Sequence, residues 1–87
     1  MSTVSWTLNQ SRLEESITIW RRDYSPDEKT RRLVREWLLF LELEPLGRGQ
    51  EDPEHPGIWF GRVTGTNVGV TYVPDVESHV VYVAMIA

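Results

Sequence analysis

The 87-residue sequence contains no cysteine, which excludes disulfide bonds, thiolate zinc sites and thiol nucleophiles. It also lacks any apolar run near the roughly 20 residues that a membrane span needs. No basic segment followed by an apolar one opens the chain, as a secretory signal would require. We therefore expect one cytoplasmic domain over residues 1–87 that makes no contact with a membrane.

Motifs for cofactor, phosphate or metal chemistry are missing as well. There is no glycine-rich phosphate loop followed by Lys and Ser or Thr, and no nucleophile motif. His55 and His79 do not stand at metal-ligand spacing, and the acidic segment 51–55 offers only a weak set of metal ligands. We expect neither a metal site nor a cofactor.

The formal net charge of −4 is unevenly distributed. Residues 12–35 contain seven Lys and Arg against five Asp and Glu, which gives +2, whereas residues 36–87 contain two against eight, which gives −6. A surface that binds phosphates gathers Lys and Arg on one face. Any contact with a polyanion is therefore expected in the first segment. Its arginines form either a basic patch or a solvated helix face on which they pair with acidic residues at i,i+4 spacing. The line of Glu28, Arg32 and Glu36 favours the solvated face.

Two helices follow a short first strand in the pattern of the sequence. Alternating polar and apolar residues predict a strand over 3–8. Apolar residues at helical spacing then predict a helix that Asn9 or Ser11 caps and that ends near Tyr24. The second helix is predicted to start after a Ser25 cap and to stop before Pro45. Its last turns are apolar on all sides, so we expect more than one neighbour to enclose them.

The remainder of the chain reads as a polar loop and three strands. The loop covers 47–57, and the strands are predicted over 58–63, 68–73 and 79–87. The element order is therefore strand-helix-helix-strand-strand-strand. It predicts an α+β fold in which two helices pack on one face of a mainly antiparallel four-stranded sheet.

Three segments carry a family resemblance: Leu41–Gly47 (LELEPLG), Val70–Asp75 (VTYVPD) and His79–Ile86 (HVVYVAMI). Together with the element order, they resemble the RelE/ParE superfamily of type II toxin–antitoxin toxins. The resemblance implies a toxin that binds a cognate protein antitoxin and inhibits either translation, through ribosome-dependent cleavage of mRNA, or gyrase. The alternative is a non-catalytic member of the same fold that acts as a protein-interaction or self-associating dimerisation module.

The catalytic pattern of the RNA-cutting members is only partly present. Those members use Lys and Arg on the sheet to stabilise the charge of the transition state, and a Tyr or His near the C-terminus. Arg62 matches a sheet cation, but Gly69 stands where an arginine is common, and the sequence reaches Ala87 without the expected basic and aromatic tail. Whether the protein is an endoribonuclease stays open. The catalytic candidates are Arg62, Arg48 and His55, and the alternatives are surface ion pairs for the arginines and a solvated histidine.

Adjacent aromatic residues give the strongest functional signal. Trp59 and Phe60 must lie on opposite faces of the sheet, because neighbouring strand residues point in opposite directions. Since the helices cover one face, one aromatic side chain should lie on the other, beside valines and tyrosines, and form a surface for a partner. The predicted partner-binding residues are Trp59, Phe60, Tyr72 and Tyr82.

Overall fold

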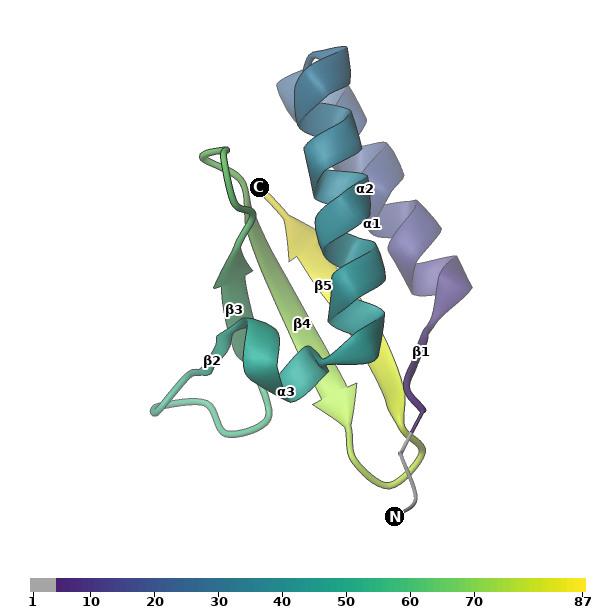
Figure 1. The fold of residues 1–87 in the computed structure, drawn as a ribbon, viewed down its shortest axis with the longest axis vertical. Helices are drawn as coiled ribbons and strands as arrows, with labels where there is room; N and C mark the ends of the chain where they lie inside the picture. The colour runs from purple at the N-terminus through teal and green to yellow at the C-terminus, as the bar shows by residue number, and fades with distance from the viewer. Residues whose placement is uncertain (1–4) are drawn as a thin grey trace.

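The computed structural model describes residues 5–87 and has an α+β fold, with the helices stacked against a five-stranded sheet (Figure 1). The helices are α1 (Gln10–Tyr24), α2 (Glu28–Leu43) and the short α3 (Pro45–Arg48). The strands are β1 (Thr7–Leu8), β2 (Gln50–Glu51), β3 (Trp59–Arg62), β4 (Gly69–Asp75) and β5 (Val80–Ile86). Their order in the sheet is β1-β5-β4-β3-β2.

The sheet is mixed, so the prediction of four mainly antiparallel strands is wrong in its details. β1 pairs with β5 in parallel, through Thr7 with Val80 and Leu8 with Val81. The fifth strand is β2, which forms inside the predicted loop by pairing Gln50 with Phe60 and Glu51 with Trp59. The general class is confirmed. The predicted first strand joins the sheet as β1, whereas β2 is a strand that the sequence pattern does not indicate.

Most predicted boundaries are close to the observed ones. α1 ends at Tyr24 and α2 ends at Leu43, as expected. The predicted first strand is longer than β1; its residues 3 and 4 lie outside the described part of the chain. His79 precedes β5 instead of starting it, because it adopts a left-handed conformation with φ of 56°.

The helix caps differ in one case from the prediction. Asn9 caps α1, since its side chain accepts a hydrogen bond from the Arg12 backbone N–H at 2.9 Å. Asp27, not Ser25, caps α2, and its side chain accepts from the Thr30 N–H at 2.7 Å. Ser25 is left-handed, with φ of 45°, and closes α1 instead.

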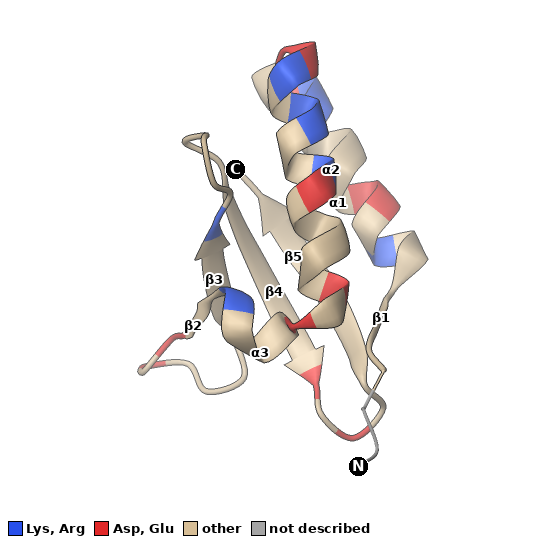
Figure 2. Ribbon diagram, viewed as in Figure 1, with Lys and Arg blue, Asp and Glu red and all other residues tan. Residues whose placement is uncertain are grey.

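The charge asymmetry of the sequence is visible in space (Figure 2). Lys and Arg gather over the N-terminal half of α2, whereas Asp and Glu occupy the β2–β3 loop and the β4–β5 turn. Arg48 on α3 and Arg62 on β3 are the basic residues on the acidic side of the molecule.

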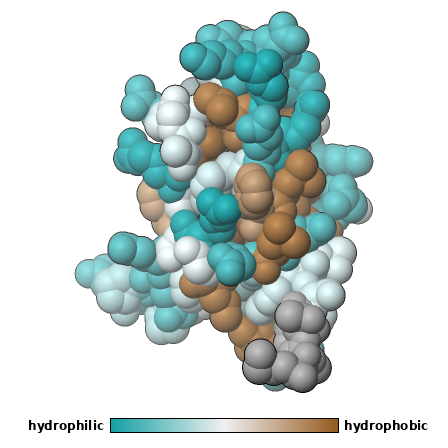
Figure 3. All heavy atoms as spheres, viewed as in Figure 1, coloured by the Kyte–Doolittle hydropathy of each residue, from teal (hydrophilic) through white to brown (hydrophobic). Residues whose placement is uncertain are grey.

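The C-terminal half of α2 is exposed on its outer side, which contradicts the expected enclosure. Leu39, Phe40 and Leu43 are 62%, 51% and 70% exposed. The opposite stripe, Val34 to Leu41, faces the core, and no element covers the outer stripe in the part of the chain that is described. Hydrophobic atoms therefore gather over this half of α2 (Figure 3). We call Leu39, Phe40, Leu43 and the exposed Leu46 the helix surface.

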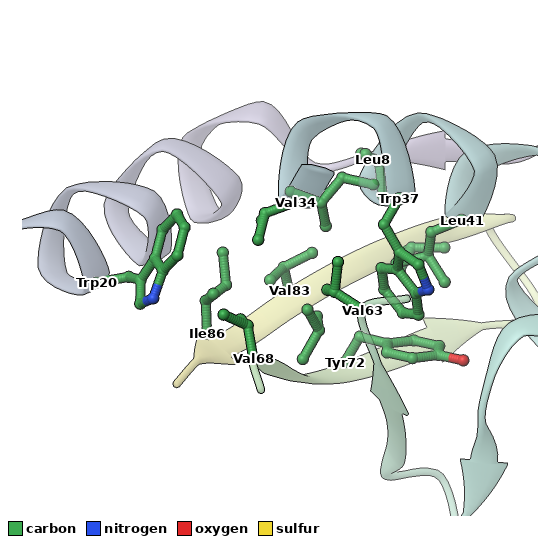
Figure 4. Close-up of a cluster of buried hydrophobic side chains, with 13 residues drawn as sticks. Leu8, Trp20, Val34, Trp37, Leu41, Val63, Val68, Tyr72, Val83 and Ile86 are labelled. Atoms are coloured by element: carbon green, nitrogen blue, oxygen red, sulfur yellow. The ribbon is translucent and has the colours of Figure 1, made fainter. Parts of the chain in front are cut away.

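The core fills the space between the helix layer and the sheet (Figure 4). Two buried hydroxyl groups tie the layers together. Ser16 on α1 donates to the Val83 carbonyl oxygen at 2.7 Å, and Tyr72 on β4 donates to the Pro45 carbonyl oxygen at 2.8 Å. The buried hydrophobic residues are Leu8, Trp20, Val34, Trp37, Leu38, Leu41, Val63, Val68, Val70, Tyr72, Val81, Val83 and Ile86.

We expect the replacement Asp27→Ser to reduce the loss of stability in acid. Hydrogen bonds from the Thr30 side chain and backbone hold the pKa of the Asp27 carboxyl below its usual value. A group with a lowered folded-state pKa stabilises the fold above its unfolded pKa, and this contribution is lost as the pH falls through the folded pKa. Serine keeps a cap without titrating. Thermal melting from about pH 6 to about pH 2 should show the two melting temperatures converging; a constant difference would contradict the prediction.

Candidate functional site

The face of the sheet opposite the helices carries exposed apolar side chains. Phe60 on β3 is 49% exposed, and Tyr82 and Met85 on β5 are 37% and 55% exposed. Trp59 lies on the other face, where it pairs with Tyr72 across β3 and β4, with their ring centroids 6.4 Å apart. One of the two adjacent aromatic residues is therefore on the open face, as expected. We call Phe60, Tyr82 and Met85 the sheet surface.

The ring of Phe60 occupies the space above Gly69. A Cβ atom at Gly69 would lie 2.6 Å from both Cε2 and Cζ of Phe60, closer than such atoms approach. Gly69 is the position where the RelE/ParE resemblance leads one to look for an arginine. Here the absence of a side chain lets the aromatic ring lie against the sheet, so this strand position contributes apolar surface in place of a cation.

Tyr72 belongs to the core and has no surface to offer a partner. Its side chain is fully buried, and burial raises the pKa of its hydroxyl to about 12. Of the four predicted partner-binding residues, Phe60 and Tyr82 are on the open face. Trp59 is half-buried against the core.

Arg48 and Arg62 line one cleft of about 400 Å³ at the β2–β3 edge. Phe60 and the carboxylates of Glu51 and Asp52 line it too. Neither arginine forms an ion pair within 4.0 Å among residues 5–87, so the expected surface ion pairs are not observed. Two arginines, two acidic residues and an aromatic residue therefore line a single cleft.

His55 does not line this cleft. It lies in the β2–β3 loop, exposed, with Nδ1 3.1 Å from Oδ2 of Asp52. Hydrogen bonds from the Glu54 N–H and from His55 lower the pKa of Asp52. The structure thus brings together two of the three catalytic candidates and places the third on the loop beside them.

A second groove, of about 280 Å³, lies beside the C-terminal half of α2. Phe40, Trp37 and Arg48 are among its lining residues. Arg48 lines both hollows, and its guanidinium carbon lies 4.8 Å from the centre of the Phe40 ring, a cation–π distance. Arg48 is therefore common to the groove that contains Phe40 and to the cleft that contains Phe60. Sequence reasoning missed the helix surface.

Comparison with family models, with curated proteins and with solved structures finds no match to this chain. Within residues 5–87, no three His, Asp or Glu side chains gather so that they could hold a metal ion. In the same stretch, each helix is too short or too polar to cross a membrane.

Proposed function

We propose that this chain is a RelE/ParE-like toxin-fold protein of a type II toxin–antitoxin module, and that it binds an extended segment of a cognate antitoxin. The segment runs over the helix surface, past Arg48, and onto the sheet surface. The observation that carries the proposal is that Arg48 lines both the groove that contains Phe40 and the cleft that contains Phe60.

The chemistry of the path indicates what the segment contains. Exposed leucine and aromatic side chains at both ends favour apolar anchors on the partner. Arg48 and Arg62 line the cleft beside Phe60 without an ion-pair partner in the described structure, so we expect an acidic residue of the segment there. This arrangement suits a partner that wraps around the domain, and the RelE/ParE resemblance implies that an antitoxin binds in this way.

We expect the double variant Leu39→Glu/Leu43→Glu to lose affinity for the antitoxin by about a hundredfold, because two carboxylates replace its apolar anchors. Both residues are largely exposed, so the fold should be retained. The measurement is calorimetric titration with the protein that the neighbouring reading frame encodes. The matched control is Ile19→Glu/Tyr24→Glu, which adds the same charge on α1 and should leave the affinity unchanged.

The cellular test is induced expression without the antitoxin. Growth arrest, with a loss of translation or of replication, is the expected result, and co-expression of the antitoxin should relieve it. The Leu39→Glu/Leu43→Glu variant should stay toxic even with the antitoxin present. Healthy cells with unchanged translation and replication would count against a toxin.

A second candidate function is a non-catalytic interaction module of the same fold. The ring of Phe60 over Gly69 favours it, because that strand position carries no cation for RNA. An assay for cleavage of mRNA on translating ribosomes separates the candidates. An RNA-cutting toxin would cleave mRNA as the native protein and lose this activity in the double variant Arg48→Gln/Arg62→Gln. A binding module would show no cleavage in either form.

A further inference from the structure

Four arginines from two helices line one groove where α1 ends and α2 begins. Arg21 comes from α1, and Arg31, Arg32 and Arg35 come from α2. Glu28 also lines this groove, whose volume is about 260 Å³. It lies at the end of α2 opposite the helix surface, within the basic region of Figure 2. We call it the arginine groove.

The fold does not neutralise these arginines. None of the four takes part in an ion pair within 4.0 Å in the part of the chain that the structure describes. The ion pairs there are Arg12–Glu15, Arg22–Asp23 and His55–Asp52. The expected line of Glu28, Arg32 and Glu36 forms no such pair, so pairing along the helix does not account for the cluster.

Two helix ends of opposite partial charge meet at the groove. Arg21 is in the last turn of α1, where a cation is favourable, whereas Arg31 lies near the start of α2, where a cation is unfavourable and Glu28 is the acidic residue of the first turn. A bound anion would relieve the repulsion between the guanidinium groups.

We propose that the arginine groove binds a phosphate group. A phosphate monoester carries close to two negative charges and offers three strong acceptor oxygens, so several guanidinium groups can engage it at once. A carboxylate offers two oxygens and one charge, which one bidentate arginine satisfies. The volume is below that of a typical pocket for a drug-sized ligand, so the groove takes phosphate groups, not a whole nucleoside.

The test is titration of the whole chain with pyrophosphate, followed through the Nε–Hε resonances of its arginines by NMR. We expect Arg21, Arg31, Arg32 and Arg35 to shift together. The double variant Arg21→Gln/Arg31→Gln should weaken binding by at least about tenfold. The control Arg22→Gln/Lys29→Gln removes the same charge outside the groove lining and should change the affinity by less than about twofold.

A third variant is expected to change the affinity for pyrophosphate in the opposite direction. Glu28→Gln removes the carboxylate of the groove and should tighten pyrophosphate binding by about threefold. No shift at the four arginines, equal weakening by both double variants, or no effect of Glu28→Gln would each overturn the proposal. Tighter binding of a polyglutamate peptide than of pyrophosphate would overturn it in favour of an acidic protein segment.

A short single-stranded oligonucleotide identifies the source of the phosphate. If the strand binds better than pyrophosphate, log affinity should fall with log salt by about 0.7 per contacted phosphate, and the ligand is a nucleic-acid backbone. If pyrophosphate binds better, the ligand is a free phosphate compound. Both results support a phosphate site, and neither depends on the proposed antitoxin, which binds elsewhere.

Discussion

Replacement of Gly49 by alanine is expected to destabilise the domain by about 3 kcal/mol. A Cβ atom at Gly49 would lie 2.3 Å from the Phe60 carbonyl oxygen and 2.7 Å from the Tyr72 hydroxyl oxygen. The first contact is with backbone, which cannot rotate away as a flexible side chain would. The pairing of β2 with β3 should therefore open, and with it the cleft between Arg48 and Arg62. Urea denaturation should show the midpoint fall.

Gly47→Ala is the matched control, two residues earlier in the chain. Its added Cβ would meet only the Glu44 side chain, at 3.4 Å or more, so the stability should stay the same or rise by up to about 1 kcal/mol. Gly49 has a negative φ of −135°, so the expected effect arises from the clash and not from the backbone conformation. Equal midpoints for the two variants would show that β2 can move without loss.

The elements that the sequence predicts well are those whose pattern is local. α1 and α2 carry apolar residues at helical spacing, and β4 and β5 are rich in β-branched residues. β2 could not be predicted, because Gln50 and Glu51 become a strand only by pairing with Phe60 and Trp59. The parallel pairing of β1 depends on a partner about 73 residues away, which no local pattern encodes.

The features of the candidate surfaces also differ in whether a local pattern predicts them. That one of Trp59 and Phe60 lies on the open face follows from the two-residue period of a strand, but the period does not say which one. The fit of its ring over Gly69 depends on two different strands and could not be predicted. The helix surface was misjudged because a helix that is apolar all round predicts burial, whereas here one stripe is left uncovered. Charge counts located the basic segment, but the convergence of Arg21 with Arg35 needs the packing of α1 on α2.

Truncation of Tyr72 is expected to have the second large effect. Tyr72 is fully buried, and its ring contacts Trp59 and Trp37 at centroid distances of 6.4 and 6.3 Å. Tyr72→Ala should cost about 4 kcal/mol, because it leaves a cavity in the core and leaves the buried Pro45 carbonyl oxygen without this donor. Tyr72→Phe keeps the ring and should cost about 1–2 kcal/mol. Denaturant titration of both variants measures the two contributions separately.

Titration of the Tyr72 hydroxyl should make the stability of the fold depend on pH in the alkaline range. Burial raises the pKa of Tyr72 from 10.0 to about 12, since the charged form would lose its hydration. The unfolded chain releases this proton near the ordinary pKa while the folded chain keeps it, so the contribution is complete below pH 10.0 and is lost as the pH rises toward about 12. Tyr72→Phe should therefore lose less stability than the native protein over this range. Identical profiles for Tyr72→Phe and the native protein would mean that the Tyr72 hydroxyl reaches water.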